Sequence, residues 1–347
     1  MERFEWILET PSYGRSVSDD DWENLEPAHI EIWKSAIELL SKRTLQLSES
    51  VISIEIDWRP ILRKHERHYR IMRHLHSAVR TKRDPSLILK TFPKHKARVK
   101  FIAKITGLDQ KSQSSAPHLA ESAIKSFIFD FFLILNISAP GSCDFYRSTL
   151  LRNGQRDDLS LSNVHFELAQ LGSIEEKWLQ IHVLPLPRTV KWFDAVRSGS
   201  HQLPENPMEK ALFALLHISK LDMDPMITIW LFYAFESLLQ TRTGENFSTL
   251  TARLVALLEL DDVQGRGLRK RLRALYDIRS AIVHGGLEIT HPLQADNLDE
   301  RVDESLARAS EATNFGLTVL ISAIQKTIVR GWKYPSFSER IHGVTVD

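Results

Sequence analysis

Apolar side chains recur with two different periods over the first two hundred residues of the chain. Four short segments alternate apolar and polar side chains, as half-buried strands do: 51–58, 98–105, 164–168 and 178–183. Three longer segments carry apolar residues as helices do: 22–41, 63–83 and 120–136. Asp84-Pro85 would end the second of these helices, and the prolines at 185 and 187 would close the region. Residues 1–200 are therefore predicted to form an α+β region.

After Gly199 the signals are those of helices alone. Five segments are predicted to be helical, with approximate limits 206–220, 224–239, 248–260, 266–284 and 299–329. Asn206-Pro207 and Asp224-Pro225 each place a capping side chain before a proline, which the first helical position tolerates. Gly285 can adopt the left-handed conformation that ends a helix. Short connections between five helices indicate a bundle, so residues 201–335 are predicted to be an all-α domain in a mainly α protein.

The formal net charge of +1 conceals a strong separation of charge along the chain. Between Arg59 and Lys104 there are 15 Lys or Arg residues and two acids, so this segment carries +13 and the rest carries −12. Such a separation is typical of proteins with an anionic partner. With Trp58 and Tyr69 nearby, the segment is a candidate RNA-binding surface. It could equally bind a regulatory protein or be a solvated helix face.

Composition excludes several classes of protein. With 43% hydrophobic and 26% charged residues, the chain resembles an ordinary folded protein and not a disordered one. Cys143 is the only cysteine, so neither an internal disulfide nor a thiolate zinc site within the chain is expected. Residues 1–6 show no secretory signal, and the apolar run 124–137 is shorter than the ~20 residues of a membrane helix. A cytoplasmic protein without membrane contact is expected.

No metal or cofactor is expected either. Histidines occur close together at 65, 68, 74 and 76, but without a His-Glu-x-x-His spacing, and the surrounding positive charge opposes a cation. Gly265-x-Gly267 does not continue into a nucleotide-binding pattern, and no Gly-x-Ser-x-Gly motif occurs.

One predicted helix carries the chemistry that stands out. Its end reads Tyr276, two residues, Arg279, four residues, His284 and then Gly285. Upstream, the apolar segment 230–239 has Glu236 near its centre. Together these features resemble the Apea-like branch of the HEPN family over about residues 207–330.

The resemblance implies a metal-independent endoribonuclease, a hydrolase that cleaves RNA by attack of the ribose 2′-OH on the adjacent phosphorus. It implies that Arg279 and His284 are catalytic and that the chain forms a homodimer through the HEPN-type domain, with the catalytic groove at the two-fold interface. It further implies a place in phage (antiviral) defence or in a toxin system. The N-terminal region would then sense a trigger or position the RNA, and a regulatory or antitoxin protein is a further expected partner.

The residue types suit this chemistry. Histidine titrates nearest neutral pH and can act as acid or base, while the arginine fork stays charged and matches phosphate oxygens. Arg279 and His284 are five residues apart, so a regular helix separates them by about 140° and about 7.5 Å along its axis. They do not share one face of the helix. They could flank a cleft whose opposite wall comes from a second copy.

Each of these residues also has a structural interpretation. His284 could bond free carbonyls at the helix end, and Arg279 could form an ion pair with Asp277 or Glu236. Glu236, on an apolar helix, is expected to be buried and therefore paired, either orienting Arg279 or bridging within the bundle. Tyr276 could contact RNA but suits the core better.

The same helix is strongly basic, which suggests a surface for RNA phosphates or a solvated face. The residues concerned are Arg266, Arg269, Lys270, Arg271 and Arg273.

Ser280 separates the two main hypotheses. Catalytic HEPN members usually carry Asn, Asp or His after the arginine, whereas this chain carries a serine, which is a weaker orienting group. The first hypothesis is an active HEPN endoribonuclease. The alternative, which Ser280 favours, is a non-catalytic HEPN module that binds RNA or a partner protein.

Overall fold

The computed structural model describes residues 2–11, 19–46, 50–81, 96–108, 113–197, 201–221, 225–241, 247–288, 291, 293 and 298–338, with the backbone alone at 19–24, 76, 79 and 80. The chain divides into two compact units. The first unit comprises Met1–Gln170 and His182–Gln202, and the second comprises Leu171–Ile181 and Leu203–Asp347. The sequence predicts a single domain boundary after residue 200. In the structure a short earlier segment, Leu171–Ile181, also belongs to the second unit.

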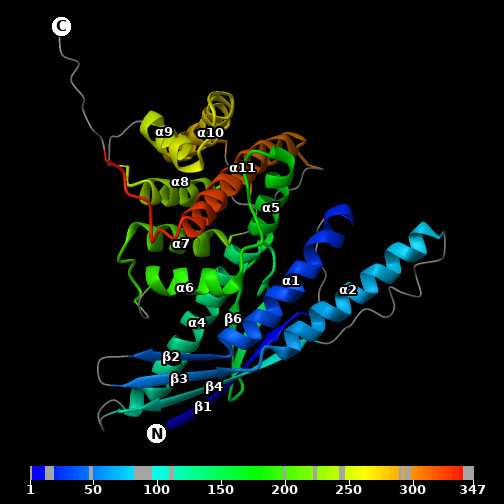
Figure 1. The fold of residues 1–347 in the computed structure, drawn as a ribbon, viewed down its shortest axis with the longest axis vertical. Helices are drawn as coiled ribbons and strands as arrows, with labels where there is room; N and C mark the ends of the chain where they lie inside the picture. Colours follow the sequence, from blue (N-terminus) through cyan, green and yellow to red (C-terminus); the bar gives the residue numbers. More distant parts are fainter. Residues whose placement is uncertain are drawn as a thin grey trace. The chain divides into compact units, whose positions relative to one another are not determined.

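The first unit contains an antiparallel sheet and the helices that cover it (Figure 1). Its described strands are β1 (Glu2–Thr10), β2 (Lys42–Gln46), β3 (Val51–Ile56), β4 (Ala97–Thr106), β5 (Ser148–Arg152) and β6 (Gln155–Leu159). Its described helices are α1 (Asp19–Leu40), α2 (Arg59–Arg80), the short η1 (Gln113–Ser115), α4 (Ala116–Ser138), the first half of α5 (Val164–Glu176) and α6 (Leu186–Val196). The strand order is β2-β3-β4-β1-β5-β6, and every neighbouring pair is antiparallel.

The two faces of the sheet differ because side chains alternate along each strand. On β4, Val99, Phe101 and Ala103 are buried beneath the helices. The indole ring of Trp58 stacks on Phe131 of α4 with ring centroids 4.0 Å apart, and it meets Phe101 edge-on. The Trp58 Nε1 donates to the carbonyl of Leu40 at 3.1 Å, so the one polar atom of this large buried side chain has a hydrogen-bond partner. The opposite face of the sheet carries charged side chains.

Two predicted strands are wrong. Residues 164–168 begin helix α5, because the Asn163 carbonyl accepts from the backbone N–H groups of Phe166 and Glu167 and starts a helical turn. Residues 178–183 form no strand, since the chain bends at 178–179 and has no regular secondary structure from 180 to 183. Their backbone is bonded instead by Ser173, whose hydroxyl donates to the Leu179 carbonyl at 2.6 Å and accepts from the Ile181 N–H at 3.0 Å. The prolines at 185 and 187 do not end the region but begin α6.

The second unit is a bundle of helices, as the sequence predicts. Its described helices are the end of α5, α7 (Pro207–Ile218), α8 (Ile227–Leu238), α9 (Phe247–Leu258), α10 (Asp262–Val283) and α11 (Arg301–Val329). Asn206 caps α7 as predicted, since its side chain accepts from the Glu209 N–H at 2.9 Å. The predicted cap Asp224 lies outside the described residues.

Helix α11 forms the centre of this bundle. Its second half is almost continuously buried, and Gly316 lets it approach α8 and α10 closely. A Cβ at Gly316 would lie 2.7 Å from Leu275 Cδ2 and 3.1 Å from Leu231 Cδ1. Among the described helices, α11 alone is long and apolar enough to cross a membrane, but 78% of its apolar window is buried inside the protein. Such burial is typical of a core helix.

Candidate functional site

Helix α10 carries the candidate catalytic residues and has well-defined ends. Asp261 and Gln264 form a reciprocal capping box, so the helix starts earlier than the predicted Arg266. At the other end Gly285 has φ +69°, and the Gly286 N–H donates to the Ala281 carbonyl at 2.7 Å. This arrangement satisfies the last carbonyls of the helix and confirms the predicted left-handed glycine.

Arg279 is half-buried and faces helix α8. Its Nη2 lies 4.0 Å from Glu236 Oε1, which is the limit of an ion pair and too long for a hydrogen bond. The Glu236 side chain is 48% exposed, so the expectation that this carboxylate is buried is wrong. The other suggested partner, Asp277, instead accepts from Arg273 Nε at 3.0 Å. An exposed pair at this distance contributes about 0–1 kcal/mol, and it leaves the guanidinium available to an anion.

His284 is exposed at the C-cap of α10. Its backbone N–H continues the helix by donating to the Ser280 carbonyl at 3.0 Å. Within the part of the chain that the structure describes, the imidazole forms no hydrogen bond. The structural role of bonding free carbonyls is therefore not seen here.

Tyr276 packs into the bundle. Its ring meets Phe232 of α8 edge-on at 5.7 Å and Phe247 of α9 at 5.3 Å, and the Arg273 guanidinium lies 5.2 Å from its centroid. Tyr276 is half-buried, and these contacts hold its ring between α8 and α9. Ser280 is half-buried one residue beyond Arg279.

Of the five predicted RNA-contacting residues of α10, Arg271 and Arg273 form ion pairs with described residues and the other three do not. Arg266, Arg269 and Lys270 are exposed and form no ion pair with any residue that the structure describes. Arg271 instead turns toward the bundle, where it pairs with Glu176 and its guanidinium lies 3.9 Å from the centroid of Phe315. Burial lowers the pKa of Arg271 below its ordinary value, and nearby acids oppose that shift. Contacts within the chain therefore hold Arg271 more firmly than Arg266, Arg269 and Lys270.

The structure does not bring Arg279 and His284 together within one chain. Since α10 remains a regular helix through Val283, the two side chains leave its axis about 140° apart. Arg279 faces α8, whereas His284 lies on the solvent side in line with the exposed basic residues. Neither contacts the other.

A row of aromatic side chains on α7 and α8, which ends one turn from Glu236, was not identified from the sequence. The exposed imidazole of His217 stacks on Trp230, with centroids 4.0 Å apart and planes 3° apart. Trp230 meets Tyr233 edge-on at 6.1 Å, and Tyr233 is 41% exposed. Partial burial against Trp230, and then the charge of Lys220, lower the pKa of His217, which favours the neutral ring. Tyr233 and Glu236 share one face of α8, so the row leads toward Arg279.

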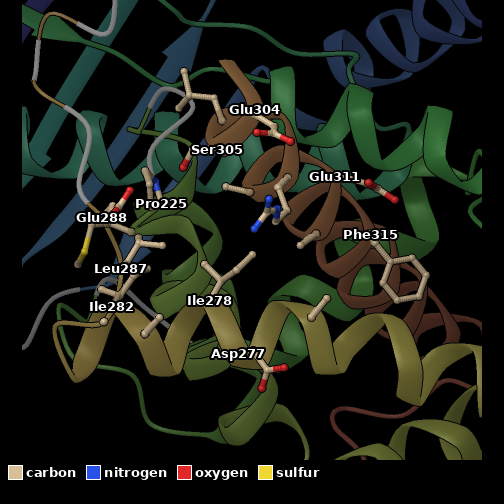
Figure 2. Close-up of a pocket in the computed structure, with 18 of the residues that line it drawn as sticks. Pro225, Asp277, Ile278, Ile282, Leu287, Glu288, Glu304, Ser305, Glu311 and Phe315 are labelled. Atoms are coloured by element: carbon tan, nitrogen blue, oxygen red, sulfur yellow. The ribbon is translucent and has the colours of Figure 1, made fainter. Parts of the chain in front are cut away.

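A groove of about 1110 Å³ lies between α10 and α11 and excludes both candidate catalytic residues (Figure 2). Ile278 and Ile282 of α10 line its apolar side, while Glu304 and Glu311 of α11 contribute charge. Figure 2 shows Ile278 pointing into the groove and Asp277 pointing away from it. The described residues contain no group of three or more potential metal-ligating side chains here or elsewhere.

Comparison with family models, with curated proteins and with solved structures finds no match to this chain. The HEPN resemblance therefore depends on the pattern around Glu236, Tyr276, Arg279 and His284.

Proposed function

We propose that the second unit is a metal-independent endoribonuclease of the HEPN type that acts as a homodimer, in phage defence or a toxin system. The observation that carries this proposal is the state of its two candidate catalytic groups. The His284 imidazole is exposed and has no hydrogen-bond partner among the described residues, and Arg279 is held only by a loose ion pair with Glu236. Both groups remain available to an RNA phosphate.

The reaction needs only proton transfer and charge stabilisation. The ribose 2′-oxygen forms a bond to phosphorus and loses its proton, while the bond from phosphorus to the 5′-oxygen breaks and that oxygen gains a proton. The products are a 2′,3′-cyclic phosphate and a 5′-hydroxyl. His284 would donate or accept a proton, and Arg279 would stabilise the charge that develops on the phosphoryl oxygens. No metal ion takes part in these steps.

The geometry of α10 supports the proposal of a homodimer. One chain presents Arg279 and His284 on different faces of α10, which favours a phosphate site shared by two protomers. A two-fold axis beside the end of α10 would set Arg279 of one protomer opposite the partner's His284. The aromatic row of His217, Trp230 and Tyr233 would then offer flat surfaces to unpaired bases, which favours single-stranded RNA.

The alternative function is a non-catalytic module that binds RNA. Ser280 favours it because a serine hydroxyl orients a neighbouring group less firmly than an amide or a carboxylate.

The test is incubation of the purified protein with total RNA and with tRNA in EDTA, beside His284→Ala and Arg279→Ala. Cleavage by the wild type alone, leaving cyclic phosphate ends, supports the nuclease. His118→Ala and Arg156→Ala are matched controls, since both residues are exposed and lie in the first unit. Equal cleavage by all five proteins points to a contaminating nuclease. Retained RNA binding without cleavage by any of them favours the non-catalytic module.

A further inference from the structure

In the structure, the basic residues between Arg59 and Lys104 fall into two sets, one that pairs with described acids and one that does not. On the outer face of the sheet, the β4 cations pair with acids of neighbouring strands. Lys100 lies 2.8 Å from Glu5, Lys104 lies 2.9 Å from Glu55, and Arg98 lies 3.3 Å from Glu9. This part of the charge is neutralised within the sheet.

Arg59, at the start of α2, also pairs with an acid, Asp57. The exposed arginines from Arg63 to Arg73 instead pair with no acid that the structure describes. One face of α2 is buried against the first unit through Ile61, Ile71 and Leu75. The opposite face is exposed and carries a row of basic side chains at helical spacing, called here the α2 stripe: Arg63, Arg67, Arg70, Arg73 and His74.

None of the four arginines of the α2 stripe forms an ion pair with a residue that the structure describes. Arg70 Nε approaches only the carbonyl of Glu66, at 3.4 Å, and Arg73 lies 5.7 Å from the ring centroid of Tyr69. Like charges three or four residues apart disfavour a helix, so the stripe works against the stability of α2 in the free protein. An anion with several charges in a row would remove this repulsion.

The geometry of the stripe selects the class of that anion. Arg63 to Arg73 span about 15 Å along the helix axis, with successive arginines about 4.5–6 Å apart. A linear polyanion with regularly repeated charges matches such a row better than a single small anion does. Guanidinium forks also match phosphate oxygens, and every cation in the row except His74 is arginine.

We propose that the α2 stripe binds the phosphodiester backbone of a nucleic-acid strand. Because this site lies in the first unit, it does not depend on catalysis by Arg279 and His284. It would hold the strand through phosphates alone, so its affinity would be independent of base sequence and would weaken steeply with salt.

The test measures binding of labelled 30-mers of oligo-U and oligo-dT to the full chain in EDTA, at several salt concentrations. All proteins carry His284→Ala, so RNA stays intact and binding is read separately from cleavage. The test variant changes Arg63, Arg67, Arg70 and Arg73 to Gln, which retains good helix propensity. The control changes Arg3, Arg98, Lys100 and Lys104 to Gln and removes the same charge from positions that are already paired.

We expect Kd to be at least about tenfold higher in the test variant. Loss of four phosphate contacts to a single strand should also reduce the slope of log association constant against log salt concentration by about 3 in magnitude. The control should bind as the parent does. An equal loss of affinity for oligo-U and oligo-dT identifies the phosphodiester backbone as the ligand. A loss of affinity for oligo-U alone identifies RNA as the ligand.

Equal weakening in the test and control variants would overturn the proposal, since it would show an effect of net charge. Unchanged binding in the test variant would overturn it as well, as would binding of poly-Glu but not of either oligonucleotide, which would indicate an acidic protein partner. A further variant with Lys at all four positions distinguishes loss of charge from misfolding. It keeps the positive charge and should retain most of the salt-dependent affinity.

Discussion

Arg279 Nη2 lies 4.0 Å from Glu236 Oε1, across the contact between α10 and α8, and no closer acid restrains its guanidinium among the described residues. The pair is loose and partly exposed, so it can orient the arginine without neutralising it firmly. Glu236 also brings negative charge near the position at which a phosphate would bind. It should therefore affect RNA affinity and turnover in opposite directions.

Glu236→Gln should lower KM for RNA several-fold, because it removes repulsion of the phosphate. It should also lower kcat, because Arg279 loses the group that orients it. Steady-state cleavage of a short labelled RNA measures both constants. Asp277→Asn is the matched control, as Asp277 pairs with Arg273 on another face of α10. Unchanged kcat and KM in Glu236→Gln would show that the 4.0 Å pair has no part in the reaction.

A mixed dimer of one Arg279→Ala chain and one His284→Ala chain should regain about half of the wild-type cleavage, although neither mutant homodimer is active. In that dimer one of the two composite sites keeps both residues. Different affinity tags on the two chains allow the mixed species to be isolated and its cleavage measured. An inactive mixed dimer would mean that each site is built within one protomer.

Tyr233→Ala should weaken binding of single-stranded RNA by about 1–3 kcal/mol, which is the range for one stacked base, and should change duplex binding little. Fluorescence anisotropy with a single strand and with a hairpin of equal length tests this. Tyr146→Ala, in the first unit, is the control. If Tyr233→Ala instead converts dimers to monomers, the aromatic row is a contact between copies and not a base-binding surface.

Two glycine substitutions in the bundle should have opposite effects on stability. Gly316→Ala should reduce the free energy of unfolding by about 1–3 kcal/mol, because its Cβ would collide with Leu275 and Leu231. Gly267→Ala should increase it by about 0.5–1 kcal/mol, because Gly267 lies in α10 with open space around its Cβ. Urea unfolding followed by circular dichroism measures both values. A stabilising Gly316→Ala would show that α11 can shift away from its neighbours.

The helices of the second unit could be predicted because their ends are marked locally. Asn206-Pro207 caps α7, and Gly285 ends α10, each through bonds to residues within a few positions. The first unit lacked such marks at several strands. In β1 the residues Trp6 and Leu8 face the core, but Ile7 between them hides the alternation.

The hairpin of β5 and β6 did carry a usable signal. Asn153 and Gly154 both have positive φ, as the two-residue turn between these strands requires. The polar residues of β6 concealed the second strand, because this edge strand is largely exposed and needs few apolar side chains.

Of the candidate site, the angular separation of Arg279 and His284 followed from helix geometry alone. The exposure of Glu236 did not, since it depends on how α8 packs and not on its composition. The stacking of His217 on Trp230 joins two helices, and no local pattern marks such a pair.

Asp130→Asn should remove a pH dependence from the stability of the first unit. Asp130 Oδ1 accepts from Arg197 Nε at 2.8 Å, and the Arg197 side chain is only 7% exposed. Burial raises the pKa of Asp130 to about 6 from its ordinary 3.8, although Arg197 opposes the shift. Between these two values the native protein keeps a proton that the unfolded chain has released. Asp130 therefore makes the protein less stable as pH rises through this window, by about 3 kcal/mol at most.

Urea unfolding of the wild type and of Asp130→Asn at intervals from about pH 4 to about pH 7 isolates this contribution, because the other carboxylates are common to both proteins. The wild type should lose stability relative to the variant up to about pH 6, and the difference should then level off. The absolute offset between the two proteins also includes the lost ion pair, so only its change with pH tests the prediction. Parallel curves over the whole range would show that Asp130 is already ionised at low pH, and that Arg197 compensates fully for its burial.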